Sequence, residues 1–94
     1  MPDYVTAAPG TNPDSPYRLF QQVALIWDVV EHGLKRGDLA TIVEHHPSEE
    51  REDGYSLEVF NALGETIVVI TLPASALQPL SANEILHVRS FTAA

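Results

Sequence analysis

The chain has 94 residues, no cysteine, and five Lys and Arg against thirteen Asp and Glu, which gives a formal net charge of -8. This length suffices for one domain with a modest core, and the lack of cysteine excludes a disulfide framework and favours a cytoplasmic location. The acidic balance repels phosphate backbones, so it disfavours nucleic-acid binding and favours a basic protein partner. The longest apolar run, residues 67–72, is far shorter than the roughly 20 residues of a membrane-spanning helix, and no membrane segment is expected.

Residues 1–19 are predicted to form a flexible tail. They contain four of the seven prolines and show no apolar period, so they cannot bury enough surface to offset the entropy lost on ordering. Tyr4, Val5 and Tyr17 are the side chains of this tail that could dock on the domain or on a partner. The folded domain is predicted to comprise residues 20–94.

The first half of the domain shows the period-two pattern of β-strands. Residues 21–28 predict a strand with two largely apolar faces, which is typical of a strand near the middle of a closed sheet. Residues 29–38 predict a long loop, in which Gly33 and Gly37 supply positive φ angles at little steric cost. Residues 39–46 predict the next strand.

A charged hairpin and two further strands follow. Residues 47–54 begin with proline, are almost entirely charged and end in an Asp-Gly dipeptide, which predicts an exposed hairpin tip. Residues 55–60 alternate between apolar and polar side chains, as expected of a strand with one solvated face, and residues 61–64 predict a turn. Residues 65–72 are the most apolar strand, and we expect them inside the sheet because they would promote aggregation at an open edge.

The last part of the chain completes a barrel pattern. Residues 73–79 are bounded by prolines and predict one turn of 3₁₀ helix. An amphipathic helix over residues 74–86 is the alternative, although Pro79 would interrupt it. Residues 84–89 predict the last strand. Five short strands, a long loop after the first and a 3₁₀ turn before the fifth indicate an all-β fold, a small SH3-like five-stranded barrel.

Two long stretches carry a family resemblance: VALIWDVVEHGLKRGDLATIVE and YSLEVFNALGETIVVITLPASALQPL. The pattern is an apolar strand ending in Asp, a Gly-Leu-x-x-Gly-Asp turn, an apolar strand and a later hairpin with a Leu-x-x-Leu close. Over about residues 20–89 the chain resembles the small, mostly bacterial and often cyanobacterial family catalogued as domain of unknown function 4926. The resemblance implies an SH3-like fold and brings no established activity and no catalytic residues. The longer proline-rich N-terminus and the longer acidic hairpin of this chain depart from the pattern.

The tripeptide Arg36-Gly37-Asp38 matches an integrin-binding motif, but its setting predicts a structural turn. Gly37 turns the chain, and Asp38 is expected to accept hydrogen bonds from nearby backbone N–H groups. Lys35 and Arg36 are the only adjacent cations in the chain. They are expected to project into solvent, where they could anchor an acidic partner.

The histidines are interpreted as solvated. His45 and His46 are adjacent, so in a strand they point to opposite faces and cannot chelate one metal ion together. One of them could instead join Glu44 or Glu49 across the hairpin. The acidic run at residues 49–53 lacks the spacing of a calcium-binding loop and is interpreted as a solvated tip.

Catalysis has little support in the sequence. No serine lies in a recognisable nucleophile motif and no glycine-rich phosphate loop is present, so the chain is predicted not to be an enzyme and to use no cofactor. The single tryptophan, Trp27, is expected in the core or at the barrel rim. Alternatively, it serves as an aromatic platform for an extended peptide, as in SH3-type grooves.

The sequence therefore predicts a small non-catalytic protein-interaction module, which we interpret as the acidic neutralising or regulatory partner of a basic protein, in the manner of an antitoxin or an inhibitor. The residues predicted to contact that partner are Trp27, Glu31, His32, Lys35, Arg36, Glu49, Glu50, Glu52 and Asp53. One alternative is a homo-oligomeric or accessory subunit whose apolar first and fourth strands continue across an interface. A less favoured one is a nucleic-acid-binding barrel, because outside the acidic hairpin the domain offers only Lys35, Arg36 and Arg89 as cations.

Overall fold

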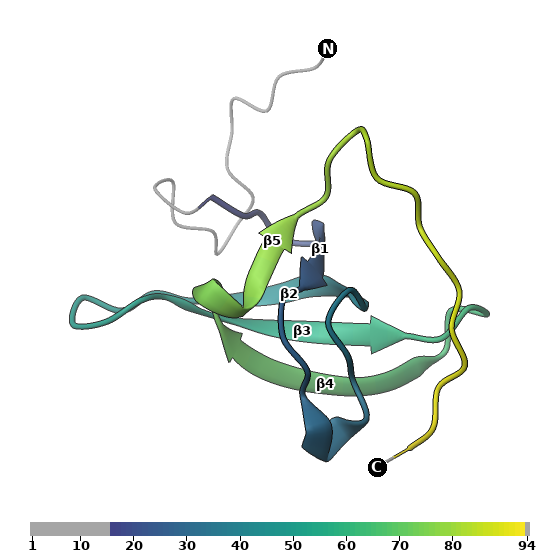
Figure 1. Cartoon of the computed structure of the whole chain (residues 1–94). Coiled ribbons are helices and arrows are strands. Elements are labelled where there is room, and N and C mark those ends of the chain that lie inside the picture. Colours follow the sequence, from purple (N-terminus) through teal and green to yellow (C-terminus); the bar gives the residue numbers. More distant parts are fainter. Residues whose placement is uncertain (1–15, 94) are drawn as a thin grey trace.

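The computed structural model describes residues 16–93 (Figure 1). Of the tail predicted for residues 1–19, residues 1–15, with Tyr4 and Val5, lie outside the described residues. Five antiparallel strands form one sheet in the order β4-β3-β2-β1-β5. The strands and two 3₁₀ turns are β1 (Gln22–Leu25), η1 (Val30–His32), β2 (Leu39–His46), β3 (Gly54–Phe60), β4 (Thr66–Pro73), η2 (Ala74–Ala76) and β5 (Leu77–Pro79). Within this part of the chain, no helix reaches the length and apolarity needed to cross a membrane.

The prediction of an all-β fold with five strands is confirmed. The sheet curves strongly, so that β1 and β5 lie above β3 and β4 in the view of Figure 1. It is not closed into a barrel, because β4 and β5 are its two edges. The 3₁₀ turn expected before the fifth strand is confirmed as η2, and no α-helix forms over residues 74–86. The φ angles of Gly33 and Gly37 are positive, as predicted, at 70° and 94°.

The positions of the last two strands differ from the prediction. The apolar strand β4 lies at an edge of the sheet and not inside it, because it pairs with β3 alone among the described strands. The fifth strand directly follows η2, where β1 pairs with it through contacts such as Leu25 opposite Leu77. The second side of β1 is thereby occupied, and residues 84–89, predicted to be the last strand, form no strand.

The core lies within the curve of the sheet. Strand β1 is buried on both faces, as its apolar pattern predicts, with Val23, Ala24 and Leu25 all inaccessible to solvent or nearly so. Strand β3 shows the expected alternation between buried apolar and partly exposed polar residues. Removal of these apolar side chains from water supplies most of the favourable free energy of folding. Further core residues come from the other elements: Val29, Leu34, Ala40, Ile42, Ile70, Ala76 and Leu77.

Tyr17, which the sequence places in the tail, belongs to this core. It is 6% exposed, and its ring meets that of Tyr55 edge-on, with the centroids 5.4 Å apart. Its hydroxyl donates a hydrogen bond of 3.3 Å to the carbonyl oxygen of Leu77. Burial raises the pKa of the Tyr17 phenol. These contacts join the chain before β1 to β3 and β5.

We expect Tyr17→Ala to lower the free energy of unfolding by about 3 kcal/mol, because it removes a buried aromatic ring and leaves a cavity. Leu63→Ala is the control. Leu63 is 85% exposed in the β3–β4 turn, so its truncation should change the free energy by less than about 0.5 kcal/mol. Urea unfolding followed by circular dichroism measures both variants. Equal effects of the two substitutions would contradict the placement of Tyr17 in the core.

Candidate functional site

The residues predicted to contact a partner lie in two separate places. The β1–β2 loop, residues 26–38, carries Trp27, Glu31, His32, Lys35 and Arg36, and the hairpin tip, residues 47–53 between β2 and β3, carries Glu49, Glu50, Glu52 and Asp53. In Figure 1 the tip extends from one side of the sheet, whereas the loop with η1 projects elsewhere. The structure therefore does not gather the predicted site into one surface.

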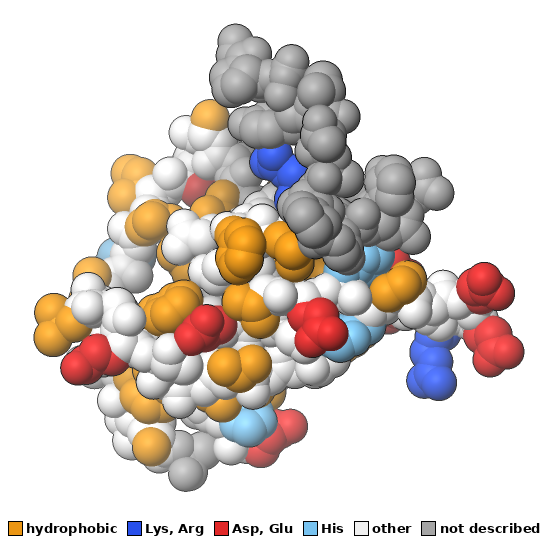
Figure 2. Space-filling view, turned by 180° about the vertical axis from the view of Figure 1, so that it is seen from behind, with side chains coloured by type: hydrophobic (Ala, Val, Ile, Leu, Met, Phe, Trp, Pro, Cys, Tyr) orange, Lys and Arg blue, Asp and Glu red, His pale blue; other side chains and the backbone are white. Residues whose placement is uncertain are grey.

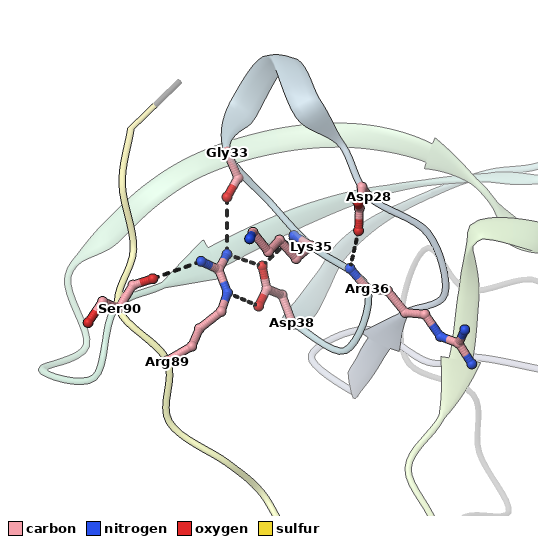
Figure 3. Close-up of polar contacts among 7 residues, drawn as sticks. All are labelled: Asp28, Gly33, Lys35, Arg36, Asp38, Arg89 and Ser90. Carbon is pink, nitrogen blue, oxygen red and sulfur yellow. Dashed lines mark hydrogen bonds and ion pairs between the residues drawn. The ribbon is translucent and has the colours of Figure 1, made fainter.

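Two aspartates fix the course of the β1–β2 loop (Figure 3). The backbone N–H of Lys35 donates to Oδ2 of Asp38 at 2.7 Å, and the backbone N–H of Arg36 donates to Oδ1 of Asp28 at 2.9 Å. Gly37 adopts a φ of 94°, in the left-handed region that glycine tolerates. The prediction that Arg36-Gly37-Asp38 is a structural turn is confirmed.

Buried apolar residues anchor the base of the loop and leave its other side chains outside. Val29 and Leu34 are buried and form an isolated antiparallel bridge, with backbone hydrogen bonds of 2.9 and 3.1 Å between them. Trp27 is 43% exposed and Val30 is 73% exposed. The first strand, predicted over residues 21–28, ends at Leu25, so the indole of Trp27 lies in the loop. All five predicted contact residues of the loop are exposed.

Arg89 joins the C-terminal part of the chain to this loop. Its guanidinium donates to Asp38 from Nε to Oδ1 at 2.8 Å and from Nη2 to Oδ2 at 2.5 Å, and Nη2 also donates to the carbonyl oxygen of Gly33 at 3.0 Å (Figure 3). Burial alone would raise the pKa of Asp38, but the hydrogen bonds from Arg89 and from the backbone N–H of Lys35 hold it below its ordinary value. One of the cations that a nucleic-acid surface would need is therefore used within the domain.

The acidic residues of the hairpin tip divide into two groups. Glu52 accepts hydrogen bonds from the backbone N–H and the hydroxyl of Ser75, at 2.7 and 2.9 Å. Asp53 is hydrogen-bonded to Nε2 of His45 at 2.7 Å and accepts the backbone N–H of Ser48 at 3.0 Å. The hydrogen bond with His45, followed by that from Ser48, lowers the pKa of Asp53. These two carboxylates tie the base of the tip to η2 and β2.

The other two carboxylates of the tip, on Glu49 and Glu50, are exposed and make no side-chain hydrogen bond or ion pair with any residue of 16–93. Figure 2, which views the molecule from behind, shows the tip projecting from the body with acidic side chains at its end. Glu52 is exposed as well, but its carboxylate already accepts hydrogen bonds from Ser75, so Glu49 and Glu50 are the tip carboxylates without such a contact among residues 16–93.

His45 is buried, and the prediction that it is solvated is wrong. Its ring stacks on that of Tyr55 at a centroid distance of 4.9 Å. The cause is a break in the register of β2 between Ile42 and Glu44, which shifts the alternation so that the residue after Glu44 faces the core. His46 points to the opposite face, as predicted, and is partly exposed.

The polar residues His46, Ser56 and Glu44 on the outer face of the sheet are not arranged as a nucleophilic triad. Nε2 of His46 lies 2.8 Å from Oγ of Ser56 and 3.8 Å from Oε1 of Glu44, so serine and carboxylate meet the same ring nitrogen. A nucleophilic triad needs them on different nitrogens. Ser56 Oγ also lies 3.0 Å from Oγ1 of Thr71, so these residues form a hydrogen-bonded row across three strands. Within residues 16–93, no three His, Cys, Asp or Glu side chains are placed to hold a metal ion.

Sequence reasoning missed a groove of about 510 Å³ between the C-terminal part of the chain and the ends of β2, β3 and β4. Its apolar lining residues include Leu39, Phe60, Ile67, Leu86, Val88 and Phe91. The carboxylate of Asp38 and the guanidinium of Arg89 stand at the same groove. The one signal in the sequence is the apolar pattern of residues 84–89, which predicts a strand but not the surface against which these residues lie.

One protein-family model, described as "Domain of unknown function (DUF4926)", matches residues 19–79. The match takes in all five strands and both 3₁₀ turns, and the resemblance drawn from the sequence is confirmed over that range. Neither a curated protein nor a solved structure matches the chain.

We expect acid to destabilise the folded chain through Asp38. Its pKa is lower in the folded chain than in the unfolded chain, so its carboxylate contributes stability that is present above the unfolded pKa of about 3.9 and is lost as the pH falls through the folded pKa. Between pH values of about 5 and 3, the melting temperature of the wild-type chain should fall more than that of Asp38→Asn, which keeps an acceptor oxygen but no charge. Glu49→Gln removes the same charge from the exposed tip and is the control. Calorimetric curves for Asp38→Asn that run parallel to the wild type would contradict the assignment.

Proposed function

The chain belongs to the family described as domain of unknown function DUF4926, and from that premise we propose that it is a small non-catalytic protein-interaction module that binds through its β1–β2 loop. The observation that carries this proposal is that the loop is ordered by its own hydrogen bonds while Trp27, Val30 and Arg36 face solvent. Tryptophan and arginine dominate the energetics of protein interfaces. A loop that is already ordered loses little conformational entropy when a partner binds.

Charge supports a basic protein as the partner. The net charge of -8 attracts a basic protein over several ångströms and increases its rate of association. Glu49 and Glu50 at the hairpin tip are the exposed carboxylates that such a partner reaches first. Lys35 and Arg36 in the loop then orient the partner by pairing with its local acidic groups. This arrangement supports the proposed neutralising or regulatory role toward a basic protein.

The proposal also keeps the SH3-like relation and the cytoplasmic location that the sequence predicts. The long loop after β1, the successive hairpins of β2, β3 and β4, and the 3₁₀ turn η2 directly before β5 support the relation to SH3-like barrels. Under this interpretation the open space between β4 and β5 is where the barrel of such a fold closes. The absence of cysteine supports a reducing compartment.

A homo-oligomeric subunit is the second candidate, and the edge strand β4 favours it. Residues 66–72 contain neither a charged residue nor a proline, and Val69 is 56% exposed. Native edge strands are normally protected by such residues or are very short, as β5 is with its three residues ending in Pro79. A second chain that pairs with β4 would cover this edge.

The proposal is tested by affinity capture with the tagged full chain from its native cell lysate. We expect one basic protein in stoichiometric amount, and at least a tenfold loss of its affinity in the double variant Trp27→Ala, Arg36→Ala. Leu63→Ala, which truncates an exposed side chain in a different turn, should bind as the wild type does. Glu49→Gln with Glu50→Gln should mainly slow association.

Unchanged capture by the Trp27→Ala, Arg36→Ala variant, with its melting temperature preserved, would contradict the loop as the binding surface. Recovery of nucleic acid, or of the chain alone at a multiple of its own mass, would instead support one of the alternatives.

A further inference from the structure

The C-terminal residues 81–93, here called the strap, cross the ends of the sheet without joining it. Figure 1 shows the strap descending from the end of β5 past the ends of β3 and β4. The only backbone hydrogen bond within it runs from the N–H of Glu84 to the carbonyl oxygen of Ser81, at 3.1 Å, and none links its backbone to a strand among the described residues. The strap lies beyond residues 19–79, which the family model matches.

Among residues 16–93, a single side chain of the strap is hydrogen-bonded to the rest of the domain. Arg89 presents the planar fork of its guanidinium to both carboxylate oxygens of Asp38 and to the carbonyl oxygen of Gly33. Such two-point pairing of arginine with a carboxylate is both strong and specific in geometry. The acceptor is held independently, because the backbone N–H of Lys35 donates to Asp38 from within the loop. Asp38 is therefore a receptor for a guanidinium whether or not the strap supplies it.

The strap forms one wall of the groove and packs loosely against the opposite wall. Leu86 and Val88 line the groove of about 510 Å³, yet they remain 62% and 84% exposed. The opposite wall is also apolar, with Phe60 and Ile67 among its residues. Clefts of roughly 300–1,000 Å³ with apolar walls and a few fixed polar groups are typical ligand sites. A segment that fits this groove more closely would bury apolar surface that the strap leaves in water.

We propose that the opposite wall of the groove, together with Asp38, is a binding site for an extended segment of a partner protein that carries alternating apolar side chains followed by an arginine, and that the strap lies against this wall as an internal copy of that segment. The chemistry of the occupant is read from the strap itself, in which Leu86 and Val88 alternate and Arg89 follows. Charge agrees with it, since a chain of net charge -8 attracts a cationic segment. The inference goes beyond the proposed function, because Trp27, Val30 and Arg36, which carry that proposal, do not line the groove.

Because the strap is covalently attached to the domain, it competes strongly with a free peptide for the site. A short covalent connection gives a binding segment an effective concentration on the order of 1 mM, so a free peptide at micromolar concentration competes poorly in the wild-type chain. Substitution of Arg89 by alanine removes the guanidinium from the strap but leaves Asp38 and the opposite wall of the groove unchanged. The site then becomes available to a peptide that still carries an arginine.

The test uses a fluorescently labelled peptide with the sequence of residues 83–92 and the full chain. By fluorescence anisotropy we expect the peptide to bind the Arg89→Ala chain at least roughly tenfold more tightly than the wild-type chain, as expected for loss of a charge-assisted pair from the competitor. A peptide in which alanine replaces its arginine should bind the Arg89→Ala chain at least roughly tenfold more weakly than the arginine peptide. This second comparison needs no further change in the protein.

The double variant Asp38→Asn, Arg89→Ala completes the design, because asparagine keeps an acceptor oxygen for Lys35 but lacks the charge that binds arginine. We expect the arginine peptide to bind this double variant only as weakly as the alanine-substituted peptide binds the Arg89→Ala chain. Equal binding of both peptides, equal binding by the wild-type and Arg89→Ala chains, or no binding at all would overturn the proposal. Sedimentation gives the last control: a wild-type dimer that Arg89→Ala dissociates would assign the groove to a second copy of the chain and also overturn it.

Discussion

The positions of the β1–β2 loop and of the C-terminal strap both depend on hydrogen bonds to the carboxylate of Asp38. It accepts the backbone N–H of Lys35 within the turn and the guanidinium of Arg89 from a segment 51 residues further along the chain. The first contact orders the β1–β2 loop, and the second brings the C-terminal strap over the groove. One partly buried carboxylate therefore anchors both segments, although its contact with Lys35 lies within the loop and does not involve the strap. A domain this small has few other means to fix exposed segments, since it contains neither disulfides nor long helices.

Three ring side chains complete the core. Three rings, those of Tyr17, Tyr55 and His45, lie in sequence through the interior, joined by an edge-on contact and a stacked one. These ring contacts link the chain before β1, the beginning of β3 and the base of the hairpin tip. The ring of His45 is hydrogen-bonded to Asp53, and this hydrogen bond also holds the base of the hairpin tip in place. The exposed acidic end of the tip therefore extends from a firmly packed base.

Local pattern predicted much of the fold and little of its surface. The period of two located the strands, and the glycines located the turns that need positive φ, since both depend only on neighbouring residues. His45 was misplaced because a single irregularity in β2 shifts the alternation and leaves no mark in the sequence. The last strand was misplaced because β1 can pair with only one further segment, and residues 77–79 reach it before residues 84–89. The contact of Arg89 with Asp38 joins distant segments, which no local pattern describes.

The central claim is that the β1–β2 loop is ordered before any partner binds, through hydrogen bonds to two aspartates. Amide hydrogen exchange followed by NMR tests this most directly, because it reports on individual backbone N–H groups. We predict that the N–H groups of Lys35 and Arg36 exchange slowly in the free wild-type chain, and that Asp38→Ala removes the protection at Lys35 while the amides of β3 stay protected. Exchange of both loop amides at the rate of an unstructured peptide in the wild-type chain would contradict the account.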